Sequence, residues 1–155
     1  MVCGIGGTGV VTVGAVLAMA AHLEGRAASV FDVTGLAQKN GAVYSHIRLG
    51  AAGAENTGPQ RIGAGEADLV LAFDMMAAAD AQALKTLDPA RSTLIGNSAV
   101  APGRRSSSPP ARPGYAGWRR DPRPRHKRTG PGRSHLIDGT RLALAASGDT
   151  IAINA

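Results

Sequence analysis

A glycine-rich turn near the start of the chain has the residue types and spacing best suited to ligand chemistry. Gly4, Gly6 and Gly9 fit the G-x-G-x-x-G spacing, and Gly7 and Thr8 lie between them. Such a turn lets backbone N–H groups approach a phosphate closely, at the positive end of the following helix. We therefore expect these five residues to bind a phosphate or nucleotide. A structural strand-to-helix corner without a ligand is the alternative.

Three further residues are candidates for the same ligand site. Asp32 falls 23 positions after Gly9, near the place where dinucleotide-binding folds put a ribose-binding acid. It is equally suited to capping the loop that follows it. Gln38 and Asn40 lie in that loop, which is bounded by glycines and is mobile enough to close on a ligand or partner. A solvated turn is the alternative for the loop.

Polar residues that follow buried runs are weaker candidates. Asp74 and Asn97 each end an apolar run, where open α/β sheets place ligand-binding groups. Asp74 is also well placed to cap a helix beginning at Met75. His46 beside Ser45 is more typical of a hydrogen-bonded structural residue, since no nucleophile–base pair accompanies it. The sequence therefore indicates no catalytic residue.

The single cysteine, Cys3, limits the metal and redox chemistry of the chain. It excludes an internal disulfide and an iron–sulfur cluster held by this chain alone, which normally takes four cysteines. We expect no metal site, a buried Cys3 and a reducing cytoplasmic location. We also expect no membrane association, because no apolar run reaches the roughly 18 residues needed to span a bilayer.

Around these residues, strand and helix patterns alternate along the chain. Val10 to Leu23 is apolar nearly all round and predicts a buried helix, and Met75 to Leu87 predicts a second. A run at 68–73 is typical of a central parallel strand buried on both faces. The remaining expected elements are strands at 27–33, 42–49, 92–96 and 135–138 and a helix at 140–147. This order predicts a Rossmann-like, doubly wound α/β fold with a mostly parallel sheet.

The positive charge of the chain is concentrated in one segment. The net charge is +6, yet residues 104–133 hold nine arginines and one lysine against one aspartate, or +9, which leaves −3 elsewhere. We expect a disordered basic insertion there, flanked by a first domain part at 1–103 and a C-terminal strand and helix at 134–155. Tyr115 and Trp118 would allow stacking on nucleic-acid bases, but no recognisable reading module is present. A solvated linker is favoured over a nucleic-acid partner.

Three segments together resemble the gamma-type domain of 2-oxoacid:ferredoxin oxidoreductases, and most of all the indolepyruvate enzymes. They are the turn at 4–9, the loop Gly35-Leu-Ala-Gln-Lys-Asn-Gly41 with 43–48, and Ala67-Asp-Leu-Val-Leu-Ala-Phe-Asp74. The segments 138–145 and 148–154 are similar to the family's final part. The resemblance covers 1–103 and resumes at about 133.

The resemblance implies a role in oxidative decarboxylation of a 2-oxoacid to acyl-coenzyme A, with electrons passing to ferredoxin. It implies coenzyme A or nucleotide binding near the glycine turn. Thiamine diphosphate and iron–sulfur clusters would lie on partner domains or subunits, including a ferredoxin-type one, so the isolated chain is not expected to be active. A non-catalytic nucleotide-binding module or an inactive remnant is the alternative, and a NAD-dependent dehydrogenase is disfavoured.

The chain departs from the family pattern in two ways. It begins inside the expected first strand and ends soon after Asn154, where the family runs on, so we expect a fragment. Residues 104–133 are rich in Arg, Pro, Ser and Gly, which GC-rich codons encode. We hypothesise a shifted reading frame over that segment of a GC-rich gene, or a degenerate gene copy. Translation of the gene in its other two frames tests the first of these.

Overall fold

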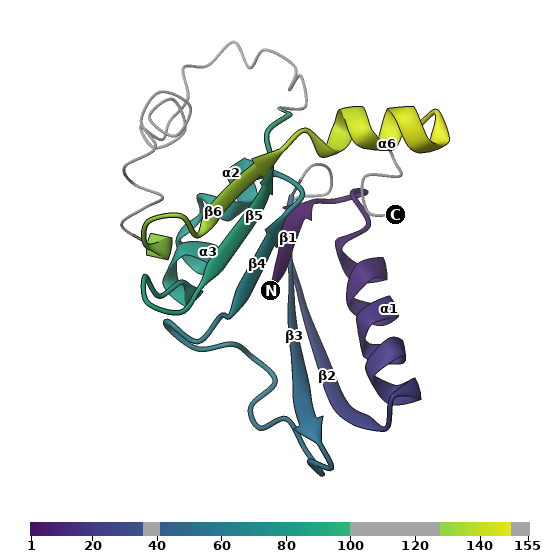
Figure 1. The fold of residues 1–155 in the computed structure, drawn as a ribbon, viewed down its shortest axis with the longest axis vertical. Coiled ribbons are helices and arrows are strands. Elements are labelled where there is room, and N and C mark those ends of the chain that lie inside the picture. Colours follow the sequence, from purple (N-terminus) through teal and green to yellow (C-terminus); the bar gives the residue numbers. More distant parts are fainter. Residues whose placement is uncertain (36–40, 100–127, 150–155) are drawn as a thin grey trace.

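The computed structural model describes residues 1–35, 41–99 and 128–149, which form one mixed β-sheet with helices on both faces (Figure 1). The strands lie in the spatial order β2-β3-β1-β4-β5-β6. Their bounds are Val2–Ile5 (β1), Arg26–Thr34 (β2), Ala42–Ala52 (β3), Leu69–Ala72 (β4), Thr93–Asn97 (β5) and Ser134–Ile137 (β6). The pairs β1–β4, β4–β5 and β5–β6 are parallel, whereas β3 is antiparallel to both β1 and β2. The predicted α/β class with a mostly parallel sheet is confirmed.

The helix α1 (Val10–Leu23) follows β1 as predicted and packs across β2 and β3. It approaches the sheet closely at Gly14, where an added Cβ would lie 2.6 Å from Oγ of Ser45. Gly25 has φ 68° directly after the helix, the left-handed conformation in which glycine commonly ends a helix. The local pattern therefore determined both ends of this helix.

The predicted single helix at 75–87 is wrong, because two short helices occupy this segment. They are α2 (Met75–Ala78) and α3 (Ala81–Thr86). Between them Asp80 is extended, with φ −70° and ψ 150°, and its side chain accepts a hydrogen bond from the N–H of Gln82 at 3.2 Å. Asp80 thus caps a new helix start where the apolar pattern alone predicts continuity.

The expected burial of α1 on all sides is also wrong. Val16, Met19 and Leu23 are 61%, 59% and 80% exposed. The reason is that α1 meets the sheet with one side only, and no described residue covers its outer side. On the same face of the sheet Leu69 of β4 is 39% exposed, so that β4 is not buried on both faces as predicted.

The hydrophobic core lies on the opposite face, between the sheet and α2 and α3. Cys3, Val70 and Leu94 are fully buried there, together with the helix residues Ala77 and Ala83. The expected burial of Cys3 is confirmed. Among the described residues, no helix has the length and apolar character needed to cross a membrane.

Candidate functional site

The carboxyl ends of β1 and β4 form the point at which the chain connections diverge to opposite faces of the sheet. From β1 the chain passes to α1, which packs over Ser45. From β4 it passes to α2, whose Ala77 clusters with Tyr44. Ser45 and Tyr44 are adjacent in β3, so their side chains point to opposite faces, and Figure 1 shows α1 and α2 on the two sides. In open α/β sheets, ligands bind in the crevice outside such a switch point.

The glycine turn lies at this switch point, directly after β1. The N–H of Thr8 and its hydroxyl both donate to the carbonyl of Ile5, at 3.1 and 2.7 Å, and close the turn. Gly7 has φ 91° and Gly9 has φ 75°, left-handed conformations that favour glycine. A Cβ on Gly7 would meet no atom within 4 Å, so this residue faces open space.

Among the described residues, no side chain accepts the free N–H groups at the amino end of α1. Gly9 is the N-cap, no side-chain cap bond forms, and the first turn holds no acidic residue. The first N–H groups of any α-helix lack partners within the helix. Together with the dipole of this 14-residue helix, they favour a bound anion.

Gly4 has a different position from the other glycines of the motif. It is buried within β1, where an added Cβ would lie 2.5 Å from Oγ1 of Thr8 and 2.9 Å from Val10. Gly4 therefore permits close packing beneath the turn, while the exposed Gly6 and Gly7 form its outer surface.

Asp32 is exposed on β2 and is not brought next to the turn. It pairs with Ser45 of β3, which in turn pairs with Val2 at the start of β1. Standard strand spacings place it about 10 Å across the sheet and about 10 Å along it from the end of β1. The intervening antiparallel β3 accounts for this separation. Its role with a ribose stays a prediction.

Gln38 and Asn40 lie outside the described residues, but both flanks of their loop are described. The N–H of Gly35 donates to the carbonyl of Ala42 at 3.1 Å, and the N–H of Gly6 donates to the carbonyl of Gly41 at 3.0 Å. The second bond links the end of this loop directly to the glycine turn.

The polar residues at the other strand ends have structural partners. Asp74 accepts the N–H groups of Met76 at 2.8 Å and Ala77 at 3.1 Å, which confirms the capping alternative. The amide of Asn97 accepts the N–H of Gly139 at 3.0 Å and donates to Oγ1 of Thr140 at 3.0 Å. Asn97 therefore joins the end of β5 to the start of α6 (Gly139–Ser147).

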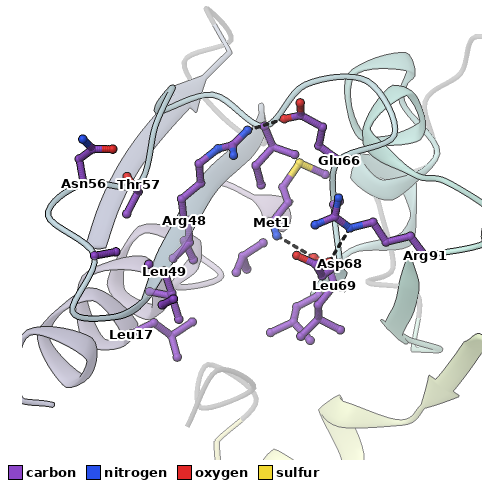
Figure 2. Close-up of a pocket in the computed structure, with 18 residues that line it drawn as sticks. Met1, Leu17, Arg48, Leu49, Asn56, Thr57, Glu66, Asp68, Leu69 and Arg91 are labelled. Carbon is purple, nitrogen blue, oxygen red and sulfur yellow. Dashed lines mark hydrogen bonds and ion pairs between the residues drawn. The ribbon is translucent and has the colours of Figure 1, made fainter. Parts of the chain in front are cut away.

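A cavity of about 460 Å³ lies at the opposite end of the strands from the glycine turn, by the amino ends of β1 and β4 (Figure 2). Its apolar wall includes Leu17 of α1. Its rim holds two ion pairs, Arg48 with Glu66 and Arg91 with Asp68, the second at 2.5 Å. The N–H of Gly63 and then the Arg48 guanidinium lower the pKa of the Glu66 carboxyl group by hydrogen bonding. The hydrogen bond from Arg91 lowers the pKa of the Asp68 carboxyl group.

Sequence reasoning missed this cavity, because the paired residues are 18 and 23 positions apart and carry no motif. Each of the two arginines is matched by a carboxylate, and the Met1 amino group, which also lines the cavity, donates to the carbonyl of Leu69 at 2.7 Å. Among the described residues, no group of three or more His, Cys, Asp or Glu side chains is placed to hold a metal.

His46 is a buried strand residue whose ring is held in place. Its Nδ1 accepts the N–H of Ile62 at 3.2 Å, and its ring lies 6.0 Å from that of Phe31. Desolvation by burial, then the charges of Arg61, the Met1 amino group and Arg48, lower the pKa of the imidazole. The predicted structural role of this histidine is confirmed.

A model of the pyruvate ferredoxin/flavodoxin oxidoreductase family matches residues 1–155, the whole chain. The chain belongs to this family. A curated relative, the indolepyruvate oxidoreductase subunit IorB of Methanothermobacter thermautotrophicus, is 31% identical over 108 residues. The match covers 70% of this chain and 52% of the relative, so the chain spans about half the length of the curated relative that it matches.

Solved structures of three oxidoreductase proteins share the fold of this chain. Subunit PORC of pyruvate oxidoreductase from Thermotoga maritima has a TM-score of 0.60 at 19% identity, covering 98% of this chain and 68% of that one. The gamma subunit of a keto/oxoacid ferredoxin oxidoreductase from Geobacter sulfurreducens has a TM-score of 0.58 at 18% sequence identity. That match covers 99% of this chain and 68% of the other. The third structure is the 2-oxoglutarate:ferredoxin oxidoreductase of Magnetococcus marinus, solved with 2-oxoglutarate, coenzyme A and succinyl-CoA. It has a TM-score of 0.60 at 16% sequence identity, and the match covers 99% of this chain and 22% of the other. At these identities the likeness concerns the fold.

Proposed function

We propose that this chain is the gamma-type domain, or a fragment of it, in an enzyme that oxidatively decarboxylates a 2-oxoacid to acyl-coenzyme A and passes electrons to ferredoxin. Family membership supports this proposal. The 31% identity to an indolepyruvate oxidoreductase subunit favours an aryl 2-oxoacid such as indolepyruvate as substrate. The enzyme would work in the cytoplasm, in keeping with a single reduced and buried cysteine.

The proposed task of this domain is to bind the phosphates of coenzyme A or of a nucleotide at the glycine turn. The observation that carries the proposal is the position of this turn at the switch point between β1 and β4, before a helix without a side-chain cap. Gly6, Gly7, Thr8 and Gly9 would surround the phosphate, and Gly4 would support them from below. Bound coenzyme A would supply the thiol that accepts the acyl group.

Partner domains or subunits would hold thiamine diphosphate and the iron–sulfur clusters. This chain has one cysteine, which is buried, and its described residues include no candidate metal cluster. The chain would therefore contribute binding and assembly, and other parts of the enzyme would contribute the reaction steps.

Exposed apolar residues indicate where those partners would dock. Val16, Met19 and Leu23 of α1 and Leu142 and Leu144 of α6 are all more than half exposed. The three residues of α1 recur at helical spacing and share one side of that helix, and an exposed apolar side of this kind is typical of an interaction site. We propose that the thiamine-diphosphate-bearing and ferredoxin-type parts of the enzyme cover this surface, and that ferredoxin itself contacts them.

Calorimetric titration with coenzyme A, ATP and NAD tests the ligand site. We expect Gly7→Val to weaken coenzyme A binding about tenfold or more, because a side chain there enters the space above the turn. Gly53→Val is the matched control, since Gly53 has φ 77° and equally open surroundings in the turn that follows β3. Asp32→Ala tests whether a ribose contact contributes.

The titration also separates the two candidate functions. Stronger binding of ATP or NAD than of coenzyme A would favour the alternative, a non-catalytic nucleotide-binding module. Equal weak heats for all ligands and variants would contradict both and leave a scaffold or inactive remnant.

A further inference from the structure

A second cavity, of about 510 Å³, lies on the face of the sheet that carries α2 and α3. It is enclosed by His46 of β3, the segment 61–64 and the residues Ala81, Gln82, Lys85 and Thr86 of α3. It lies beside the amino ends of β1 and β4, at the end of these strands that is away from the glycine turn. Nothing in the proposed function uses this cavity.

The walls of the cavity are linked to one another by hydrogen bonds. The N–H of Ile62 donates to Nδ1 of His46 and joins β3 to the segment 61–64. The N–H groups of Gly65 and Ala67 donate at 3.0 Å to the carbonyls of Lys85 and Thr86, which joins the same part of the chain to the end of α3. The cavity is therefore preformed, as small-molecule sites usually are.

The charged groups that line the cavity are all positive. Arg61 and Lys85 line it, and neither side chain has an ion-pair or hydrogen-bond partner within the described part of the chain. The nearby acids are engaged elsewhere: Glu66 binds Arg48 and the N–H of Gly63, and Asp80 accepts the N–H of Gln82. This contrasts with the cavity of Figure 2, where each arginine is matched by a carboxylate.

His46 adds a neutral donor to the two cations. Because its Nδ1 accepts a hydrogen bond from Ile62, the ring proton of the neutral form resides on Nε2. No described group accepts that second N–H, and the residue lines the cavity. A guanidinium, an ammonium and an imidazole N–H together match the charge and the several oxygens of a phosphoryl group better than a singly charged carboxylate.

We propose that this cavity binds a small molecule that carries a phosphoryl group, with Arg61, Lys85 and Nε2 of His46 as the donors. The remaining lining by Ile62, Ala64 and Ala81 would contact an apolar part of the same molecule. The site is separate from the glycine turn and does not depend on the coenzyme A proposal.

The test follows the imidazole resonances of the full-length chain by NMR while inorganic phosphate is added at constant ionic strength. Bound phosphate should move the His46 signals saturably and raise the pKa of this ring, which Arg61, the Met1 amino group and Arg48 lower in the free protein. The His46→Gln variant assigns the signals, and His22 and His135 serve as internal references.

Arg61→Gln and Lys85→Gln should each weaken phosphate binding about tenfold, the usual effect of removing one charged hydrogen bond. Arg141→Gln, an exposed change of the same charge on α6, should have no effect. Acetate, used in place of phosphate, should bind more weakly. Unmoved His46 signals would overturn the proposal, as would equal effects of Arg141→Gln or equal binding of acetate.

Discussion

Gly14 of α1 lies directly over Ser45 of β3, so that a Cβ on Gly14 would be 2.6 Å from the buried Oγ of Ser45 and 3.3 Å from Val30. That Oγ has no hydrogen-bond partner among the described residues. The contact fixes how closely the helix after the glycine turn approaches the sheet. It also means that the amino end of α1, where we propose phosphate binding, is positioned by packing against a strand far away in sequence.

Gly14→Ala should therefore lower the free energy of unfolding by about 1–2 kcal/mol, because the overpacking cost exceeds the gain in helix propensity. Ser45→Ala should have little effect or be slightly stabilising, since it removes an unsatisfied buried hydroxyl. The double variant should recover most of the loss. Urea denaturation of the four proteins measures this cycle, and strictly additive effects would contradict the proposed contact.

The stability of the protein should decrease as the pH falls below about 6.5, in part through His46. Burial and nearby cations lower the pKa of His46 in the folded state, whereas the unfolded chain has the ordinary value near 6.5. Between these two pKa values the unfolded chain binds one more proton at this histidine than the folded chain does. The contribution of His46 to the free energy of unfolding is therefore greatest above about pH 6.5 and is lost as the pH falls toward the folded-state pKa. His46→Gln should flatten this part of the curve measured by thermal unfolding. His22→Gln, the same substitution at an exposed position of α1, is the control.

Cys3 should react with thiol reagents only after unfolding. Burial raises the pKa of its thiol to about 12, so that almost no reactive thiolate exists at pH 8. Ellman's reagent should detect no thiol in the native protein and one thiol per chain in denaturant. Rapid reaction without denaturant would show that β1 opens readily and is less firmly held in the sheet than its pairing indicates.

Asp74 should contribute to stability through its cap on α2. Asp74→Ala should lower the free energy of unfolding by about 1 kcal/mol, because the N–H groups of Met76 and Ala77 lose their acceptor. Asp74→Asn keeps an acceptor oxygen and should be close to wild type in stability. If coenzyme A binding falls in the asparagine variant while stability is retained, Asp74 also has a ligand role.

The exposed side of α1 should be required for assembly with the other parts of the enzyme. Val16→Glu and Met19→Glu place charges on the proposed docking surface, but both side chains are already exposed and folding should be unaffected. Each should reduce co-purification with a co-expressed thiamine-diphosphate-bearing subunit. Ala90→Glu, an exposed change with the same charge elsewhere, is the control. Full co-purification of all three variants would contradict docking through α1.

Much of the local structure was predictable because it depends on residues close together in sequence. The helix at Val10–Leu23, its stop at Gly25 and the caps of Asp74 and Asp138 follow from side chains within four residues of the backbone groups that they affect. The glycine turn is local for the same reason, since Thr8 closes it onto Ile5. The division of 75–87 into two helices was missed, although Asp80 carried a capping signal within an apolar pattern.

The sequence by itself determined the α/β class, the glycine turn and the family resemblance, because strand and helix patterns and glycine spacing are local properties. Only the tertiary structure decided that β3 lies between β1 and β2, which separates Asp32 from the turn. Strand order and the pairing of Arg48 with Glu66, or of His46 with Ile62, depend on contacts between residues more than ten positions apart. The two cavities described above arise from such contacts, and therefore no short sequence pattern predicts them.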